Sequence, residues 1–354
     1  MLQKLFMRRM GRYYKTLLAI KQFRLLLKKF YRFVFPAPDH WVHFLSILDG
    51  TTLEYSPDLN EKAKQDLFKR NITLFELEPH AYCNRTCSFC PNSTIDRLTV
   101  QTKLDRQLYV KVLDELQTIS YDKVLRFARY SEPMADNHIY EMVSLARQYL
   151  PEANIDIVTN GDYLNAEALN RLREVGLSIL RISIYMRKNI PWSVKNAQEE
   201  ILRLAQRIEI DPKWLSFTES TVAAKFPYSG METLVYSHNF DKIGYDRGHL
   251  VSDLIDKTYV RQSPCFLVFS NFTVDYNGKV MPCCNLRIDH VDHEQFILGD
   301  LQNTDQNIFD IYAKRLSTAW RRSLVKVEDK QYPCDSCKQK ILNGAVLGLS
   351  LIHI

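Results

Sequence analysis

The stretch ITLFELEPHAYCNRTCSFC, residues 72–90, joins an apolar segment to three closely spaced cysteines. Residues 72–78 have the β-branched and aromatic composition of a buried strand. Cys83, Cys87 and Cys90 then follow in the pattern C-x3-C-x2-C. On a loop, this spacing can turn three thiolates toward one metal centre, and sulfur ligands select zinc or iron–sulfur clusters over hard cations. The stretch therefore predicts a metal-binding loop at the end of a strand.

Strands and helices alternate after this loop. Further strands are predicted at 123–130, 154–161, 177–185 and 214–222, and helices at 104–119, 137–150, 165–175 and 193–208. A short polar helix is expected at 60–69, while a sixth strand before residue 250 has no clear signal. This alternation is typical of an α/β fold with a parallel sheet, open or closed into a barrel.

Two polar motifs stand where the second and third of these strands end. They are YSEP, residues 130–133, and TNG, residues 159–161. In parallel sheets, ligands collect at the C-terminal ends of the strands. The cysteine loop and these two motifs are therefore expected to meet around one site.

The pattern changes after about residue 255. Asn277-Gly278 is a strong hairpin signal between alternating segments, and a helix is predicted at 307–325. Four well-spaced cysteines accompany these elements, namely Cys265, Cys283, Cys334 and Cys337. This part of the chain is expected to form a small second domain organised around its cysteines, as either a zinc ribbon or a closed iron–sulfur site.

The first cysteine group has three members instead of four. A structural zinc site normally uses four protein ligands, and a structural 4Fe–4S cluster uses four cysteines. His80 is the nearest further candidate ligand, and a structural zinc site is the alternative interpretation. A cluster held by three cysteines keeps one iron open, and catalysis requires an open position.

The triplet, with the aromatic Phe89 before its last cysteine, resembles the signature of the radical S-adenosylmethionine superfamily. The resemblance covers about residues 72–250 and implies a partial (β/α)6 barrel. It also implies that S-adenosylmethionine chelates the open iron of a 4Fe–4S cluster. One electron, from a donor such as flavodoxin or ferredoxin, then cleaves the sulfonium, and the resulting 5′-deoxyadenosyl radical takes a hydrogen atom from the substrate.

The resemblance also implies which residues contact the cofactor. The superfamily usually has Gly-Gly-Glu-Pro after its second strand, so Glu132 and Pro133 match here, whereas Tyr130 and Ser131 replace the glycines. The implied cofactor-binding residues are Phe89, Tyr130, Ser131, Glu132, Pro133, Thr159, Asn160 and Ser183. For the last three, ordinary strand-end chemistry is the alternative.

The second cysteine group resembles the auxiliary-cluster domains of the same superfamily, called SPASM in the long form and Twitch in the short form. Four ligands fit the short form, which holds one auxiliary 4Fe–4S cluster. Such a closed cluster would transfer electrons or shape the pocket. A zinc ribbon is the alternative.

Two further residues are catalytic candidates. Arg247 lies 18 residues before Cys265, at the junction of the two predicted domains, where pockets are common. Dehydrogenases of this superfamily that act on aminocyclitols use an arginine in about this region to bind or deprotonate the substrate; a structural salt bridge is the alternative. Cys284 is left over from the two groups, and it is either a hydrogen-atom donor for an epimerase or a small buried residue.

Three functions are consistent with these features. The first is dehydrogenation or epimerisation of a sugar or aminocyclitol. The second is the modification of a ribosomal peptide. The third is a non-catalytic iron–sulfur or zinc protein. A substrate that is a small molecule or a peptide is therefore expected.

The net charge of +6 comes from one segment of the chain. Residues 1–35 carry ten Lys or Arg and no Asp or Glu, so the rest of the chain has a net charge of −4. This distribution argues against nucleic-acid binding. The basic segment predicts an amphipathic helix, packed on the protein or docked on an anionic membrane surface or an acidic partner.

No export signal or membrane span is evident, so a cytoplasmic protein is expected, with peripheral contact at the inner face of the membrane as one alternative. In a reducing compartment, the eight cysteines indicate metal binding or catalysis and not disulfides. The predicted domains are a basic helical extension at 1–70, the radical barrel at 71–250 and the auxiliary cluster domain at 251–354.

Overall fold

The computed structural model describes residues 58–244, 246–254, 258–326 and 328–339. The predicted basic helix at 1–35 lies outside these ranges. Within them, ten strands form one sheet in the order β10-β9-β8-β1-β2-β3-β4-β7-β6-β5. None of the described helices has the length and apolar character that crossing a bilayer requires.

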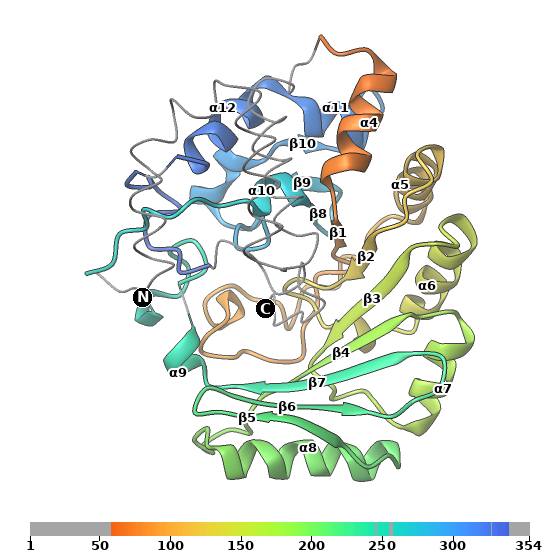
Figure 1. The fold of residues 1–354 in the computed structure, drawn as a ribbon, viewed down its shortest axis with the longest axis vertical. Coiled ribbons are helices and arrows are strands. Elements are labelled where there is room, and N and C mark those ends of the chain that lie inside the picture. Colours follow the sequence, from red (N-terminus) through yellow and green to blue (C-terminus); the bar gives the residue numbers. More distant parts are fainter. Residues whose placement is uncertain (1–57, 245, 255–257, 327, 340–354) are drawn as a thin grey trace, which may run out of the picture.

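The centre of the sheet is parallel. Its strands are β1 (Leu74–Leu77), β2 (Val124–Phe127), β3 (Asn154–Thr159), β4 (Ile179–Ile184) and β7 (Glu232–His238). The connecting helices are α5 (Arg106–Thr118), α6 (His138–Tyr149), α7 (Ala166–Glu174) and α8 (Val194–Ile208), and they follow one side of the sheet (Figure 1). The predicted α/β fold with a parallel sheet is confirmed.

Polar side chains fix the start of three of these helices. Asp105, Asn165 and Ser193 each accept a hydrogen bond from the backbone N–H three residues further on. Each bond satisfies a donor that the first helical turn leaves without an intrahelical partner. The apolar faces then pack on the sheet, where residues such as Leu116 and Val143 are fully buried.

The single strand predicted at 214–222 is wrong. The structure has two antiparallel strands there, β5 (Lys213–Phe217) and β6 (Thr221–Phe226), and β6 is antiparallel to β7. Thr218 forms the turn between them, because its hydroxyl accepts the backbone N–H groups of Ser220 and Thr221. β7 supplies the parallel strand before residue 250 that the sequence left open.

The C-terminal part continues the same sheet. β8 (Asn271–Val274) is parallel to β1 and forms the expected hairpin with β9 (Lys279–Met281), next to which lies β10 (Gly299–Asp300). The helix predicted at 307–325 is interrupted at Lys314, giving α11 (Ile308–Ala313) and α12 (Arg315–Leu324). Lys314 has an extended ψ of 139°, and its ammonium group donates to the Leu298 carbonyl.

Shorter helices complete the described chain. They are α4 (Glu61–Asn71), α9 (Phe240–Ile243), α10 (Leu267–Ser270) and the 3-10 turns η1 (Pro91–Ser93), η2 (Pro133–Ala135), η3 (Ser252–Leu254) and η4 (Val291–Phe296). α4 lies beside α11 (Figure 1), and Phe68 of α4 packs edge-on against Phe272 and Phe309. Apolar contacts of this kind join the C-terminal part to the parallel sheet in one core.

Candidate active site

The three cysteines after β1 line a cavity with about 460 Å³ of empty volume. Strand ends supply most of the remaining wall. Of the residues predicted to bind the cofactor, the cavity is lined by Phe89, Tyr130, Ser131, Glu132, Thr159 and Asn160. Pro133 begins η2 and Ser183 lies in β4; neither is among the lining residues.

An ion pair clamps the cysteine loop to the end of β3. Arg85, between the first two cysteines, donates two hydrogen bonds of 2.7 and 2.6 Å to Asp162. Asn84 donates to the same carboxylate at 2.7 Å and accepts from Asn160 at 2.8 Å. Arg85 and Asp162 were not among the predicted site residues. A sequence signal was available, because the positive Arg85 lies within the cysteine motif and the negative Asp162 directly follows the TNG motif.

Glu132 connects the ends of β2 and β3. Its carboxylate accepts from the Thr159 hydroxyl at 2.5 Å and from the backbone N–H groups of Asn160 and Met134 at 2.6 and 3.0 Å. Burial raises the pKa of Glu132 to about 7, and these three donors oppose the rise. The Glu132 carboxylate is therefore bound by donors of the protein itself. The neighbouring residues Tyr130 and Ser131 line the cavity.

The cavity fits a sulfur-ligated cluster and a polar cofactor. Burial raises the pKa values of Cys83 and Cys87 to about 12, so these thiols need a metal centre to hold them as thiolates. The hydroxyl of Ser131 is buried without a hydrogen-bond partner among the described residues. Phe89 adds an apolar wall, since its ring stacks on Phe240 with centroids 3.7 Å apart.

A second cavity, with about 420 Å³ of empty volume, lies in the C-terminal part. The structure brings together all four predicted auxiliary ligands there, namely Cys265, Cys283, Cys334 and Cys337. No group of three or more His, Cys, Asp or Glu side chains in the described ranges is arranged to hold a single metal ion. The fit of both sites therefore rests on the thiols that gather around each cavity.

Arg261 organises the second cavity and was missed from the sequence. Its fully buried guanidinium donates to the Cys337 carbonyl at 3.1 Å and lies 3.5 Å from the Cys337 sulfur. It also donates to the carbonyls of Pro264 and Gln339. Backbone and sulfur contacts of this kind orient metal ligands and tune the metal centre.

Arg247 interacts with one lining residue of each cavity. It donates to Asn285 at 3.2 Å, and Asn285 lines the second cavity. On the other side, its charge lowers the pKa of Tyr130, which lines the first cavity, although burial raises that pKa far more. The arginine predicted at the domain junction is 4% exposed and is not among the lining residues of either cavity.

The turn that carries Arg247 is tied to the loop of the last two cysteines. Ser336 donates to the Asp246 carboxylate at 2.5 Å, and His249 contacts the Asp335 carboxylate at 2.8 Å. Arg247 and His249 have φ values of 53° and 71°, a region that costs about 1–2 kcal/mol per non-glycine residue. Contacts from Asp335 and Ser336 therefore hold a strained backbone in place.

Cys284 is not among the residues that line either cavity. Its thiol is buried, and burial together with the negative charge of Glu76 raises its pKa, while Arg247 and Arg129 act in the opposite direction. Tyr130 donates its hydroxyl hydrogen to the Cys284 carbonyl at 2.9 Å. The thiol thus belongs to the polar interior beside Arg247.

That interior is formed by charged side chains at matching positions of adjacent strands. Glu76, Arg126 and Asp156 are direct neighbours across β1, β2 and β3. Asp156 accepts from Arg126 at 2.7 Å and from Arg181 of β4 at 2.7 Å. Burial raises the pKa of Glu76, one of whose oxygens has no hydrogen-bond partner among the described residues. Buried charges at this density favour a polar ligand over an apolar one.

Comparison with known protein families identifies two domains. Residues 77–210 match the radical SAM superfamily, and residues 265–339 match an iron–sulfur cluster-binding domain called SPASM. The two matches contain the three-cysteine cavity and all four cysteines of the second cavity, respectively.

Individual relatives agree with these matches. A curated relative from Niallia circulans, named S-adenosyl-L-methionine-dependent 2-deoxy-scyllo-inosamine dehydrogenase, is 24% identical over 267 residues, covering 75% of this chain and 92% of the relative. The crystal structure of BtrN with AdoMet and 2-DOIA has a TM-score of 0.53 at 22% identity and covers 72% of this chain and 88% of BtrN. An open conformation of BtrN has a TM-score of 0.51 at 20% identity, covering 76% and 92%. At these identities, the two structures show a shared fold.

Proposed function

This chain belongs to the radical S-adenosylmethionine superfamily, and we propose that it dehydrogenates a small, polar ring compound of the aminocyclitol class. The predicted enzyme class and cofactors, S-adenosylmethionine and 4Fe–4S clusters, are confirmed by the two domain matches. The observation that carries the proposal is the pair of cysteine-lined cavities, with three thiols in one and four in the other, and with Arg247 bonded to Asn285 of the second cavity.

The residues of each cavity have distinct parts in this proposal. Cys83, Cys87 and Cys90 would hold the first cluster, and Cys265, Cys283, Cys334 and Cys337 the second. When bound, S-adenosylmethionine and the first cluster supply a 5′-deoxyadenosyl radical, and the second cluster supplies an electron acceptor. Oxidation of an alcohol to a carbonyl removes one hydrogen atom from carbon, one proton from the hydroxyl group and one electron.

Arg247 and the polar interior would bind the substrate. A guanidinium group donates hydrogen bonds and accepts none, so Arg247 suits a substrate hydroxyl as its proton leaves. Glu76 offers a buried carboxylate oxygen that no protein donor occupies among the described residues, which suits an amino or hydroxyl group of the ring. A small, polar compound fits this interior better than an extended peptide, which is the alternative substrate.

The proposed cofactor contacts follow the cavity wall. Phe89, Tyr130, Ser131, Thr159 and Asn160 are proposed to contact S-adenosylmethionine, because all of them line the three-cysteine cavity. Glu132 is proposed to act by holding the backbone around that cavity, since its carboxylate is filled by protein donors. Pro133 and Ser183 are assigned supporting positions behind the wall.

Epimerisation is the second candidate reaction, and it is favoured by the buried free thiol of Cys284. An epimerase must return a hydrogen atom to the substrate carbon, and the Cys284 thiol, whose pKa responds to Arg247 and Glu76, is proposed as that donor. Deuterium distinguishes the two reactions. In D2O, an epimerase transfers solvent deuterium to carbon, and Cys284→Ala abolishes that transfer, whereas a dehydrogenase forms a carbonyl in both proteins.

The main experiment uses the anaerobically reconstituted chain, which should contain about eight irons. A reductant, S-adenosylmethionine and a panel of aminocyclitols that includes 2-deoxy-scyllo-inosamine are added. One 5′-deoxyadenosine is expected for each carbonyl product. Production of 5′-deoxyadenosine that no aminocyclitol increases, together with modification of a precursor peptide, would refute the proposed substrate class.

Two finer points belong to the proposal and rest on the sequence alone. The first is a flavodoxin- or ferredoxin-type electron donor. The second is a cytoplasmic location with contact between residues 1–35 and an anionic membrane surface, which would act through the ten basic side chains. Flotation with anionic liposomes tests that contact, and protein with residues 1–35 that stays at the bottom of the gradient would rule it out.

A further inference from the structure

Asn92 follows the third cysteine of the first site and is held from both ends of its side chain. Its amide group donates to the Tyr130 carbonyl at 2.8 Å, and its amide oxygen accepts from Arg287 at 2.8 Å. The residue lines the three-cysteine cavity and is 4% exposed. Arg287 lies 195 positions away in the chain, within the matched iron–sulfur domain.

Asn92 lines the same cavity as Cys83, Cys87 and Cys90. Among the contacts of the described residues, only one of its two amide hydrogens has an acceptor, which is the Tyr130 carbonyl. An amide group has two donor hydrogens, so Asn92 can bond the Tyr130 carbonyl and a sulfur together. Hydrogen bonds to cluster sulfurs stabilise the reduced, more negative state of a cluster.

Arg287 has little freedom to move away from Asn92. Its fully buried guanidinium makes a two-fold contact with Asp289, with both distances at 2.7 Å, while the third nitrogen reaches Asn92. The central carbon of the guanidinium group, Cζ, lies 4.4 Å from the centre of the Tyr130 ring. A guanidinium fixed by planar contacts of this kind holds its partner in one orientation.

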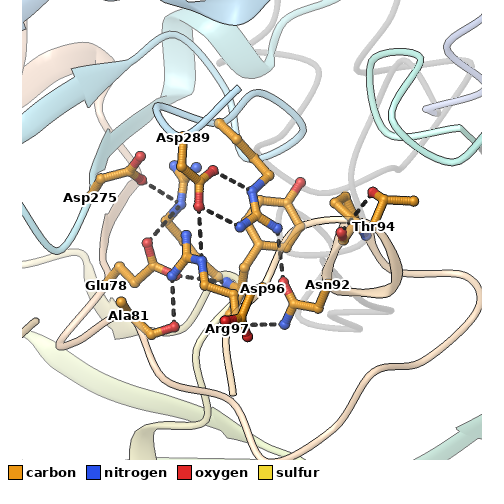
Figure 2. Close-up of polar contacts among 12 residues, drawn as sticks. Glu78, Ala81, Asn92, Thr94, Asp96, Arg97, Asp275 and Asp289 are labelled. Atoms are coloured by element: carbon orange, nitrogen blue, oxygen red, sulfur yellow. Dashed lines mark hydrogen bonds and ion pairs between the residues drawn. The ribbon is translucent and has the colours of Figure 1, made fainter. Parts of the chain in front are cut away.

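Asp289 is itself anchored to the cysteine loop. Arg97 donates to Asp289 at 2.9 Å, to the Ala81 carbonyl at 2.8 Å and to Glu78 at 3.2 Å. Figure 2 shows these contacts converging between the two parts of the chain. Although burial raises the pKa of Asp289, the ion pairs with Arg287 and Arg97 hold it well below its usual range. The carboxylate is therefore charged and keeps both arginines in place.

We propose that Asn92 raises the reduction potential of the three-cysteine cluster by donating a hydrogen bond to one of its sulfurs, and that Arg287 of the auxiliary domain is a positioning residue that acts through Asn92. The auxiliary domain thus influences how easily the first cluster accepts its electron. This influence is separate from any electron that its own cluster carries, and it does not depend on which substrate is bound.

The test is a redox titration of the reconstituted full chain without substrate, followed by electron paramagnetic resonance. The first cluster is identified as the signal that changes when S-adenosylmethionine is added. Asn92→Leu keeps the side-chain volume and removes the donor. At the wild-type midpoint potential, the reduced-to-oxidised ratio should fall about tenfold, which corresponds to about 59 mV for a one-electron couple. An unchanged ratio in a variant that keeps its irons would overturn the proposal.

Three further variants distinguish a positioning role from general damage. Arg287→Lys keeps the charge but loses the planar guanidinium group. The single variant should lower the reduced-to-oxidised ratio of the first cluster at least about threefold. In the Asn92→Leu background, the same change should have no further effect. Additive shifts, or a wild-type ratio in the single variant, would refute action through Asn92. Asn92→Asp keeps the shape and replaces the donor by an anionic oxygen, so it should shift the ratio further in the same direction.

Arg321→Met is the matched control. Arg321 is also a buried arginine of the C-terminal part, and it lies 4.4 Å from the ring centre of Tyr312. It donates to the carbonyls of Val268 and Tyr312, which both belong to the C-terminal part. The control should leave the ratio unchanged, and an equal shift would show that any lost arginine disturbs the cluster.

Discussion

Protonation of a buried histidine offers a quantitative test of the structure beside the first cavity. His238 ends β7, is 5% exposed and contacts the Thr221 hydroxyl through Nδ1 at 2.9 Å. Its Nε2 is buried without a hydrogen-bond partner in the described ranges. Burial therefore lowers the pKa of His238 to about 4 from the ordinary 6.5. The ring lies 6.0 Å from that of Phe240, which stacks on Phe89 at the cavity.

The sign of the pH effect follows from these two pKa values. Because the unfolded chain binds the proton more tightly, acid favours unfolding. The contribution of neutral His238 is complete above about pH 6.5 and is lost as the pH falls toward 4. The free energy of unfolding should drop by about 1 kcal/mol at pH 5.5 and by about 3 kcal/mol below pH 4.

The assay is urea unfolding of the loaded protein under anaerobic conditions at pH 7.5 and 5.5. His238→Gln keeps a polar side chain that does not titrate, so the wild type should lose about 1 kcal/mol more than the variant between the two pH values. Burial also lowers the pKa values of His80, His138 and His293, but these residues are present in both proteins and cancel. Equal losses in the two proteins would refute the assigned burial of His238.

Three further outcomes are expected. Replacing Cys334 and Cys337 with Ala should remove about four irons and spare some S-adenosylmethionine cleavage, as measured by iron content and 5′-deoxyadenosine; complete loss of cleavage would contradict separate sites. Arg85→Gln should loosen the clamp to Asp162 and weaken retention of the first cluster about tenfold in a chelator challenge, whereas unchanged retention would assign the ion pair no such role. Gly278→Ala should lower the free energy of unfolding by at least about 1 kcal/mol in urea, because φ is +80° there and the added carbon would meet a leucine of α5 at 2.5 Å; an unchanged midpoint would contradict this turn.

The sequence predicted the parts of the site whose chemistry is local. Cys83, Cys87 and Cys90 could be recognised because thiol ligands at short spacing have few other uses. The polar motifs at the strand ends could be placed because parallel strands present the same end to one edge. Glu132 shows the limit of this reasoning, since its motif was visible but its bonds to the next strand were not.

Long-range contacts could not be predicted in the same way. Arg287 and Asn92 are 195 residues apart, and neither belongs to a motif, so only the fold brings them together. Arg261 has the same character, because its partners are mostly backbone carbonyls that carry no sequence signal. The hairpin at β5 and β6 was missed for a local reason, as its turn uses a threonine hydroxyl in place of glycine, proline or asparagine.

The position of β1 has a consequence for how the chain folds. One edge of β1 pairs with β2, about 50 residues later, but the other pairs with β8, where Leu74 is aligned with Asn271. During synthesis, the cysteine loop therefore follows a strand with an open edge until nearly 200 further residues have been made. Contacts of such high sequence separation slow folding and leave strand edges exposed to misassembly. Removing the C-terminal part would make that exposure permanent, so expression of residues 58–264 alone should yield aggregated protein.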